Sequence, residues 1–245
     1  MVDPHYADVE LAALYDAQCP WDRRGDFDFY LPWIMDAAAV LDVGCGTGML
    51  LHGVRDRGHT GRLTGLDPGE GMLRVARTRA DVEWVLGDLS TVSWEREFDV
   101  VVMTGHAFQV LVTDEELRVS LAAVRRALTD DGVFAFETRN PAARAWEDWT
   151  PDRVEEFPGP DGHPARCHHE VTAVDGDLVT FVGTYTSPAW DGPRHSESTL
   201  RFLDVPALDG FLAEAGLRAD LRYGDWAGGP LTAAGPEIIT LARRA

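Results

Sequence analysis

The feature that most constrains the fold of this chain is the regular alternation of short apolar runs with helical patterns between residues 38 and 138. The runs at 40–43, 98–103 and 133–137 are apolar almost throughout, which is typical of strands buried on both faces. Strands that alternate with helices in this way form a parallel sheet with helices on both faces. The sequence therefore predicts an α/β, Rossmann-like, doubly wound sheet.

One helix in this region has both of its ends marked. Thr113 can cap it while Glu116 reaches back in a capping box, so the helix is expected to begin near Asp114. Its end is expected at the turn residues 129–132.

After Phe136 the pattern changes from alternating helices and strands to alternating polar and apolar residues. Residues 141–165 are rich in Pro, Trp and charge, and three strand-like segments follow, the first two joined by a hairpin signal at 175–177. This predicts an antiparallel insert. The α/β pattern then resumes with a helix at 206–216 and strands at 217–223 and 237–244.

Composition excludes several classes of function. The 22 basic residues include no Lys, which removes Schiff-base, pyridoxal phosphate and phosphate-loop chemistry. A net charge of -19 disfavours nucleic acid as a partner. Three widely spaced cysteines indicate a reducing compartment, and no leader or membrane-length apolar run is present, so a cytoplasmic location is expected.

The residues that carry chemistry follow the first strand. Glycines at alternate positions, Gly44, Gly46 and Gly48, let the main chain turn sharply and approach a ligand closely. Asp67 closes the next strand, where a carboxylate can accept hydrogen bonds from the hydroxyls of an adenosine ribose, and Asp88 closes the third, where one could accept from an adenine amino group. Ligands of such sheets bind outside the carboxyl ends of the strands, so these acids are expected to converge on one site.

The nucleotide that fits this site carries no phosphate. The NAD fingerprint has Gly or Ala where this chain has Met49, and Asp42 places a carboxylate where a pyrophosphate would lie. S-adenosylmethionine fits better, because it has a sulfonium and an ammonium in place of phosphates.

Over residues 38–140 the chain resembles the class I S-adenosylmethionine-dependent methyltransferases, through the segment DVGCGTG at 42–48, the acidic strand ends and the segment FDVVVMTGHAFQ at 98–109. The resemblance implies a seven-stranded sheet with a reversed last strand and the cofactor S-adenosylmethionine. It also implies a set of cofactor contacts: Asp42, Gly44, Cys45, Gly46 and Gly48 along the methionine, Asp67 on the ribose, Pro68 and Met72 flanking the adenine, Asp88 and Leu89 at its edge, and the Thr104 carbonyl on the ammonium.

A narrower likeness is to the small-molecule members of that class with an antiparallel lid after strand 5, such as sugar N,N-dimethyltransferases and glycine N-methyltransferase. It implies one domain over 1–245, with an N-terminal helical cap at 1–37 and the lid at 141–205. It also implies that Tyr15 closes over the cofactor and serves catalysis, with Trp21 packed nearby.

Several side chains allow two interpretations. His106 follows the fourth strand and is either a catalytic base or a hydrogen-bonding residue of the pocket wall. Arg139 either holds an anionic group of the substrate or pairs with Glu137 or with a lid carboxylate. The tryptophans at 146, 149, 190 and 226 either wall the substrate pocket or form the core of the lid.

No metal site is expected. The segment that holds His163, Cys167, His168 and His169, with His195 further on, resembles a set of ligands. However, adjacent residues of a strand point to opposite faces, and neither a Cys-x-x-Cys nor a His-x-x-x-His pair is present.

The expected function is methyl transfer from S-adenosylmethionine to a nitrogen or oxygen of a small molecule. A non-catalytic module that binds S-adenosylmethionine or S-adenosylhomocysteine is the alternative. RNA or protein methylation is less expected. For nucleic acid, the Asn-Pro-Pro-Tyr type of sequence that holds a flipped base is replaced by residues 104–107. The expected partner is a small-molecule acceptor, with neither nucleic acid nor membrane, and a homodimer is left open. The identity of the acceptor is not encoded in any pattern of the sequence.

Overall fold

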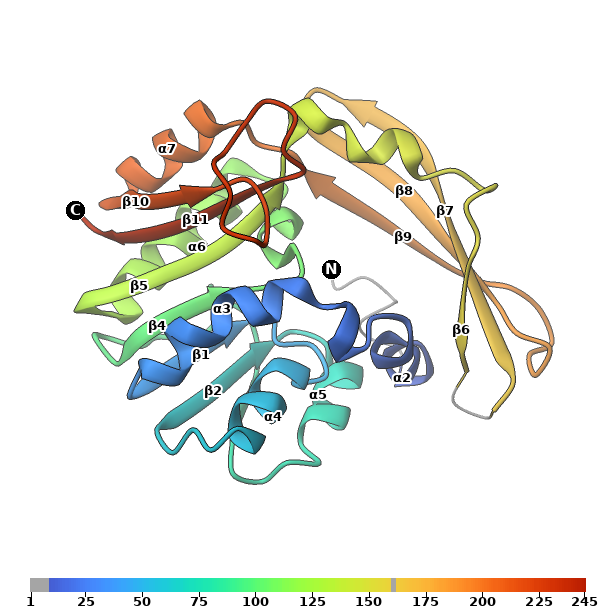
Figure 1. Ribbon diagram of the computed structural model, residues 1–245, viewed down its shortest axis with the longest axis horizontal. Helices are drawn as coiled ribbons and strands as arrows, with labels where there is room; N and C mark the ends of the chain where they lie inside the picture. Colours follow the sequence, from blue (N-terminus) through green and yellow to red (C-terminus); the bar gives the residue numbers. More distant parts are fainter. Residues whose placement is uncertain (1–8, 160–161) are drawn as a thin grey trace.

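The computed structural model describes residues 9–159 and 162–245. Its centre is a seven-stranded sheet in the order β10-β11-β5-β4-β1-β2-β3, in which only β11 runs against its neighbours (Figure 1). The strands are β1 (Ala39–Val43), β2 (Arg62–Asp67), β3 (Glu83–Leu86), β4 (Phe98–Met103), β5 (Leu128–Arg139), β10 (Leu217–Tyr223) and β11 (Glu237–Arg244). The predicted doubly wound sheet with a reversed last strand is confirmed.

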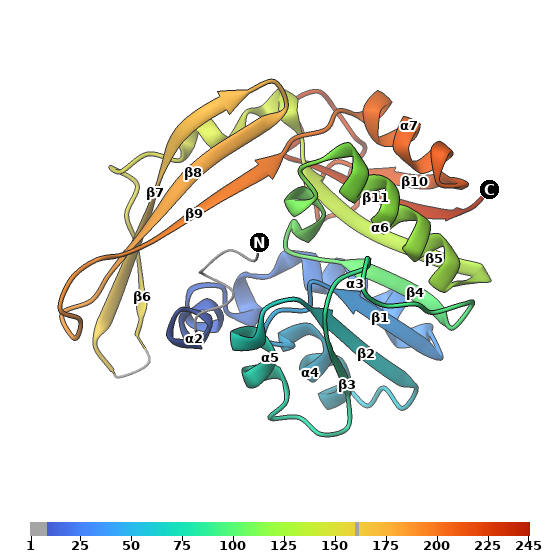
Figure 2. The same cartoon turned by 180° about the vertical axis from the view of Figure 1, so that it is seen from behind.

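Helices cover both faces of this sheet. Helices α3 (Gly25–Asp36) and α4 (Met49–Asp56) lie on one face, and α6 (Asp114–Ala127) and α7 (Val205–Glu214) on the other, which Figure 2 shows from behind. Each face has its own apolar cluster. Together the two clusters enclose β1, β4 and β5, whose carboxyl ends are thereby held in place.

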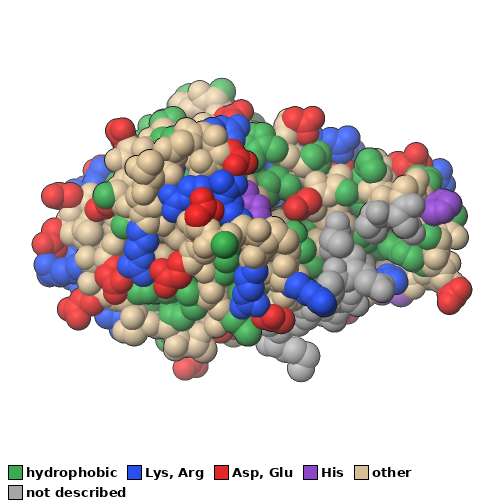
Figure 3. Space-filling view, turned by 90° about the horizontal axis from the view of Figure 1, so that it is seen from below, with side chains coloured by type: hydrophobic (Ala, Val, Ile, Leu, Met, Phe, Trp, Pro, Cys, Tyr) green, Lys and Arg blue, Asp and Glu red, His purple; other side chains and the backbone are tan. Residues whose placement is uncertain are grey.

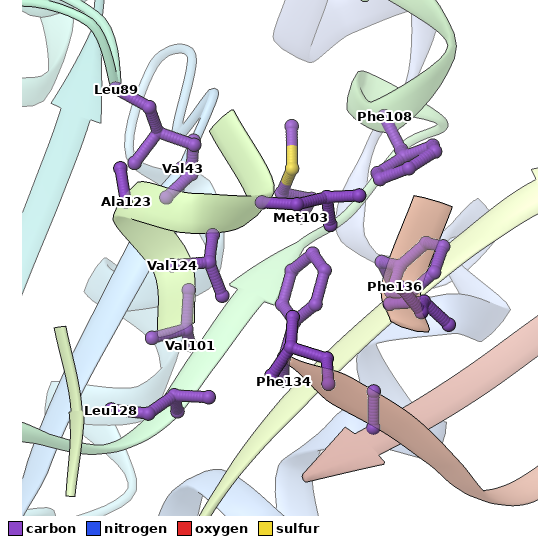
Figure 4. Packing of buried hydrophobic residues seen from close by; sticks show 14 of the residues in the cluster. Val43, Leu89, Val101, Met103, Phe108, Ala123, Val124, Leu128, Phe134 and Phe136 are labelled. Atoms are coloured by element: carbon purple, nitrogen blue, oxygen red, sulfur yellow. The ribbon is translucent and has the colours of Figure 1, made fainter. Parts of the chain in front are cut away.

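The cluster on the α6 face reaches the carboxyl end of β4. Phe136 stacks on Phe108 and on Phe134, with ring centroids 4.4 Å and 4.6 Å apart (Figure 4). Phe108 belongs to the 3-10 turn η2 (Ala107–Val110), which follows β4. This stacking anchors the turn after β4, where the sequence places its candidate base.

The predicted start of α6 is confirmed, and its predicted end is wrong. The Thr113 hydroxyl accepts from the Glu116 backbone N–H at 3.1 Å, and the Glu116 carboxylate accepts from Thr113 in return. The helix ends at Ala127, before the expected turn, and β5 already begins at Leu128. The turn residues form an irregularity in β5, because β4 advances from Phe98 to Val100 while β5 advances from Leu128 to Val133.

The segment after β5 forms the predicted antiparallel sheet, in the order β6-β7-β8-β9. It arches away from the carboxyl-terminal edge of the main sheet (Figure 1). The strands are β6 (Glu155–Pro158), β7 (Pro164–Asp175), β8 (Leu178–Thr186) and β9 (Arg194–Arg201), preceded by the 3-10 turns η3 (Pro141–Ala143) and η4 (Ala145–Asp148). The hairpin between β7 and β8 turns at Gly176, whose φ is +59°. Strand β6 was not predicted, because four residues are too few to show an alternating pattern.

The chain before β1 forms α2 (Val9–Gln18), the 3-10 turn η1 (Trp21–Arg23) and α3. Helix α2 lies between the antiparallel sheet and α5 (Glu70–Ala76) (Figures 1 and 2). Its Leu14 packs with Phe157, Cys167 and Tyr185. The first eight residues of the predicted cap lie outside the described residues. No helix in the described part of the chain has the length and apolar character needed to cross a membrane.

Candidate cofactor site

The loop after β1 places backbone, not side chains, at the ligand edge of the sheet. Gly44, Gly46 and Gly48 have φ of +74°, +56° and +78°, a region that favours glycine. A Cβ on Gly44 would lie 2.9 Å from the Ala107 Cβ, whereas no atom lies within 4 Å of one built on Gly46. The main chain at Gly46 therefore borders open space that a ligand can enter.

Asp67 holds this loop in place from the end of β2. One carboxylate oxygen accepts from the Gly46 backbone N–H at 2.8 Å, and the other accepts from the Gly69 N–H at 2.7 Å. Burial raises the pKa of Asp67, and these two donors oppose the rise. Each carboxylate oxygen has a second lone pair, so the fixed group can still accept from a ligand hydroxyl.

A small cavity of about 30 Å³ opens at the carboxyl ends of β1 and β4. It brings together the glycine loop, the end of β4 and the N-terminal helices. Its lining consists of Tyr15, Arg24, Phe27, Asp42, Gly44, Cys45, Gly46, Thr47, Met49, Leu50 and Thr104. Six of the predicted contacts, Asp42, Gly44, Cys45, Gly46, Thr104 and Tyr15, thus lie at one site.

The cavity wall carries one buried acid, Asp42, and one half-buried cation, Arg24. Asp42 is 1 % exposed and its Oδ1 is a buried atom without a hydrogen-bond partner. Burial raises the pKa of Asp42 to about 7, which the Arg24 guanidinium counteracts. Arg24 holds Asp26 with two nitrogens, at 2.9 Å from Nε and 2.6 Å from Nη2, and lies over the Phe27 ring. A wall with both charges suits the ammonium and carboxylate of an amino acid.

The residues predicted at the adenine lie outside the cavity lining, Pro68 just after β2, Met72 in α5, and Asp88 and Leu89 just after β3. Met72 and Leu89 are buried, and Pro68 is exposed. Asp88 is exposed too, and its carboxylate accepts from the backbone and hydroxyl of Ser90. These positions form the edge along which an adenine would lie, and their role stays a prediction.

Trp21 and Cys45, two further predicted contacts, both pack against other parts of the protein. Trp21 does not line the cavity: it packs on α4, where Gly53 leaves room for its ring, and Arg57 lies over it at 4.1 Å. Burial raises the pKa of the Cys45 thiol well above its usual value, with Asp42 and Asp67 adding to the rise. Cys45 is therefore a packing residue and no nucleophile.

His106 is held from two sides. Its φ of +62° is unusual for a residue with a side chain, and its backbone N–H donates to Glu137 at 2.7 Å. Its Nε2 lies 2.9 Å from Glu237 Oε2, and Tyr30 donates to Glu137 at 2.6 Å. Burial, with Arg139 next, lowers the pKa of His106 well below its usual value, so the imidazole is neutral at physiological pH.

The two acids around His106 are themselves perturbed. Burial raises the pKa of Glu137 to about 8, with Asp26 adding to the rise. Burial also raises the pKa of Glu237 to about 7, opposed by Arg139. Groups with pKa values shifted toward neutrality are common at functional sites.

Sequence reasoning missed Arg24, Glu137 and Glu237. Glu137 could have been found as the one acid in the apolar run at 133–137. Glu237 begins β11, and because β11 is reversed its first residue pairs with Arg139 at the carboxyl end of β5. Arg24 lies between η1 and α3 in no recognisable pattern.

Arg139 and the tryptophans after β5 form part of the wall between the two sheets. Arg139 donates to the Gln109 side chain at 3.0 Å and lies over Trp149 at 5.3 Å. Trp149 packs edge-on against Phe181 of the antiparallel sheet. The other three tryptophans have different neighbours: Trp146 contacts Phe202, Trp190 lies beneath Arg194, and Trp226 packs on Phe29 and Tyr30.

The histidines of the antiparallel sheet lie apart from the cavity. Across the strands His168 pairs with Thr184, and Thr184 pairs with His195. The Nε2 atom of His169 lies 3.9 Å from the Cys167 sulfur. Within residues 9–159 and 162–245, no three His, Cys, Asp or Glu side chains are grouped to hold a metal ion.

A larger surface cleft of about 280 Å³ lies at the opposite, amino-terminal edge of the main sheet. It is lined by Glu95, Arg96, Arg125, Arg126 and Arg244, none of them a predicted site residue. Arg125 and Arg126 lie in the last turn of α6, where cations complement the helix dipole. Their place at the helix end accounts for these two arginines, and the cleft does not form part of the candidate site.

Comparison with known proteins shows a family match for part of the chain. Residues 40–132 match the model of the family described as "Methyltransferase domain". A cypemycin N-terminal methyltransferase from Streptomyces sp is 32% identical over 111 residues, 44% of each chain. A ubiquinone biosynthesis O-methyltransferase from Methylobacterium sp. is 31% identical over 144 residues, 56% of this chain and 54% of that one. The chain thus matches only about half the length of these curated relatives, or less.

Solved structures match almost the whole chain. The CcbJ methyltransferase from Streptomyces caelestis superposes with a TM-score of 0.75 at 22% identity, covering 98% of both chains. S-adenosylmethionine-bound CalS10, an amino pentose methyltransferase from Micromonospora echinaspora, has a TM-score of 0.68 at 25% identity and covers 91% of both.

The fold, and the match over residues 40–132, resemble those of the class I S-adenosylmethionine-dependent methyltransferases. Within that class the chain resembles the small-molecule type with an antiparallel lid, as represented by the amino pentose enzyme. S-adenosylmethionine is the cofactor of this family, as the CalS10 complex shows for that relative.

Proposed function

We propose that this protein is an enzyme that transfers a methyl group from S-adenosylmethionine to a nitrogen or oxygen of a small molecule. The observation that carries the proposal is the cavity wall, where the buried acid Asp42 and the half-buried cation Arg24 lie beside the open main chain at Gly46. This is the arrangement that the amino acid part of the cofactor needs.

The described residues fit the cofactor. The unpartnered Asp42 oxygen would accept from the ammonium, together with the Thr104 carbonyl, and Arg24 would bind the carboxylate. Asp67 would accept from the ribose hydroxyls with the lone pairs that its two backbone donors leave free. Pro68, Met72, Asp88 and Leu89 would border the adenine.

The chemistry follows from what these residues hold. S-adenosylmethionine supplies an electrophilic methyl group next to a positive sulfur. Asp42 would lie nearer the ammonium than the sulfur, because a negative charge at the sulfur would oppose the loss of its positive charge. Holding donor and acceptor in near-attack geometry is worth ~7 to 11 kcal/mol, which makes orientation the main contribution of the protein.

The N-terminal helices and the antiparallel sheet would close over the bound ligands. Tyr15 and Arg24, from the N-terminal segment, line the cavity of about 30 Å³. Enclosure of this kind excludes water from a reaction and would give a simple binding module little benefit.

A small-molecule acceptor, without nucleic acid or membrane, agrees with the charge. Over the face seen in Figure 3, Arg side chains are interspersed with Asp and Glu and form no continuous basic surface. The printed names of the relatives include both an N-terminal methyltransferase and O-methyltransferases, so nitrogen and oxygen both remain candidates. A cytoplasmic location stays a prediction, and a homodimer stays open.

Two measurements test the proposal. Calorimetry should show binding of S-adenosylhomocysteine and none of comparable strength for NAD; tighter binding of NAD would overturn the cofactor assignment. A screen of amines and phenols with methyl-labelled cofactor should then identify an acceptor. Cofactor binding with no transfer to any acceptor would favour the non-catalytic module instead.

A further inference from the structure

The partner of the His106 ring comes from a strand far away in the sequence. Glu237 opens β11, is 8 % exposed, and its carboxylate lies 2.9 Å from Nε2 of the ring. The backbone N–H of His106 is fixed separately by Glu137. Ring and main chain are thus held by two different acids, Glu237 of β11 and Glu137 of β5.

The second ring nitrogen is left available. Nδ1 of His106 has no hydrogen-bond partner in the described part of the chain, and it is not among the buried unpartnered atoms there, so solvent reaches it. A hydrogen bond between an imidazole nitrogen and a carboxylate needs one proton. When Glu237 is ionised that proton is on Nε2, and Nδ1 carries a lone pair.

An isolated imidazole would be a poor base at this position. Burial and two cations, Arg139 and Arg24, lower the pKa of His106, and only Asp26 acts in the opposite direction. Protonation would add a positive charge next to these guanidinium groups. With ionised Glu237 as partner, the same proton converts a negative pair into a neutral one, which burial favours.

Both the position and the proton affinity of His106 thus depend on β11. The other ionisable groups around the pair, Glu137 and Tyr30, are bonded to each other. Thr104, two residues before His106, lines the cofactor cavity, so His106 follows directly on the part of the chain that borders this site.

We propose that Glu237 is a positioning residue that accepts the Nε2 proton of His106 and thereby makes Nδ1 the general base for the acceptor. This inference rests on the proposed function. The acceptor N–H or O–H gives its proton to Nδ1 as its lone pair bonds to the methyl carbon. The sulfur–carbon bond breaks, its electron pair stays on sulfur, and the products are methylated acceptor, S-adenosylhomocysteine and an imidazolium beside the Glu237 carboxylate.

The first test needs no acceptor. Nitrogen-15 NMR of the histidine-labelled chain distinguishes the two tautomers, and His106→Gln identifies the His106 signals among those of the eight histidines. At pH 9 we expect a protonated Nε2 and a bare Nδ1, and on acidification Nδ1 should take up the proton. A protonated Nδ1 at pH 9 would overturn the proposal, whether or not the protein transfers methyl groups.

The second test removes the charge and keeps the shape. In Glu237→Gln the amide oxygen can still accept from Nε2–H, and the midpoint of Nδ1 protonation should fall by at least about one pH unit, a tenfold loss of proton affinity. Glu115→Gln on the exposed face of α6 is the matched control and should leave the midpoint unchanged. An unchanged midpoint in Glu237→Gln would contradict the proposal.

With an acceptor whose nucleophile carries a proton to be removed, Glu237→Gln should lower kcat by ~10²- to 10⁴-fold and leave the affinity for S-adenosylhomocysteine within about twofold. A loss of affinity that parallels the loss of kcat would show a merely structural role and overturn the assignment. Failure of the wild type to methylate any acceptor would count against the proposed function, while the tautomer of His106 is still decided by NMR.

Discussion

Asp42 offers the sharpest test of how the cofactor is held, because its carboxylate must change its protonation when a cation binds. Burial raises the pKa of Asp42 to about 7 in the free protein, so near that pH only about half of the molecules carry the charge. An ammonium beside the unpartnered Oδ1 favours the ionised form and lowers this pKa. At pH 7, binding of S-adenosylhomocysteine should therefore release about half a proton per protein molecule.

The size of the effect follows from the free pKa. At pH 8 almost all of the free protein is ready to bind, whereas at pH 6 only about one molecule in eleven has an ionised Asp42. The dissociation constant should rise by about tenfold between pH 8 and pH 6, equivalent to ~1.4 kcal/mol. The direction is fixed: affinity decreases as pH falls through about 7.

Calorimetry at pH 6, 7 and 8 measures the affinity, and repeating the titration in buffers with different heats of ionisation counts the protons released. Asp42→Asn keeps the shape of the side chain and should bind more weakly, with the pH dependence removed. Glu137 and Glu237 remain in this variant, so a slope that survives in it would assign the titration to them. A flat profile in the wild type would refute the placement of Asp42 beside the ammonium.

Three further results are expected. Asp67→Ala should weaken cofactor binding by ~1.5 to 3 kcal/mol, and it should also lower the free energy of unfolding because the Gly46 and Gly69 N–H groups lose their acceptor. Calorimetry measures the binding and urea denaturation the stability; an unchanged dissociation constant would place the ribose elsewhere. Glu137 has a pKa of about 8 in the folded protein and a lower pKa in the unfolded chain, so the folded state binds more protons and the free energy of unfolding should fall as pH rises toward 8, by up to ~1.4 kcal/mol per pH unit. Urea denaturation should show a smaller pH slope in Glu137→Gln, and an equal slope would contradict this role of Glu137. Thr113→Ala removes the capping box of α6 and should cost ~0.5 to 2 kcal/mol of stability with cofactor affinity unchanged, so a change in affinity would argue against a purely local role.

Much of the fold could be predicted because its signals are local. Apolar runs such as 98–103, the capping box at Thr113 and the hairpin at Gly176 each depend on a few neighbouring residues. The end of α6 was mispredicted because turn-forming residues also allow a strand irregularity, and only the pairing with β4 shows which of the two occurs. Strand β6 exists through its pairing with β7 and has no pattern of its own.

Some residues of the candidate site could likewise be predicted from local sequence, and others could not. Asp42, the glycines and Asp67 follow strands directly, so a sequence pattern reveals them together with the edge on which they lie. Arg24 reaches the cavity from the connection between η1 and α3, and its position depends on how the N-terminal segment packs over the sheet. That packing is a tertiary property which residue spacing does not express.

Glu237 shows what kind of information was missing. In a parallel sheet the ligand edge collects residues that end strands, and a residue that begins a strand normally lies at the far edge. Because β11 is reversed, its first residue lies at the ligand edge. Glu237 therefore pairs with Arg139, and its carboxylate reaches His106. The expectation of a reversed last strand therefore already implied that the first residue of the segment 237–244 lies at the ligand edge. Because that residue is an acid whose burial is compensated by a histidine and an arginine, the reversal of one strand places a proton acceptor beside the candidate base.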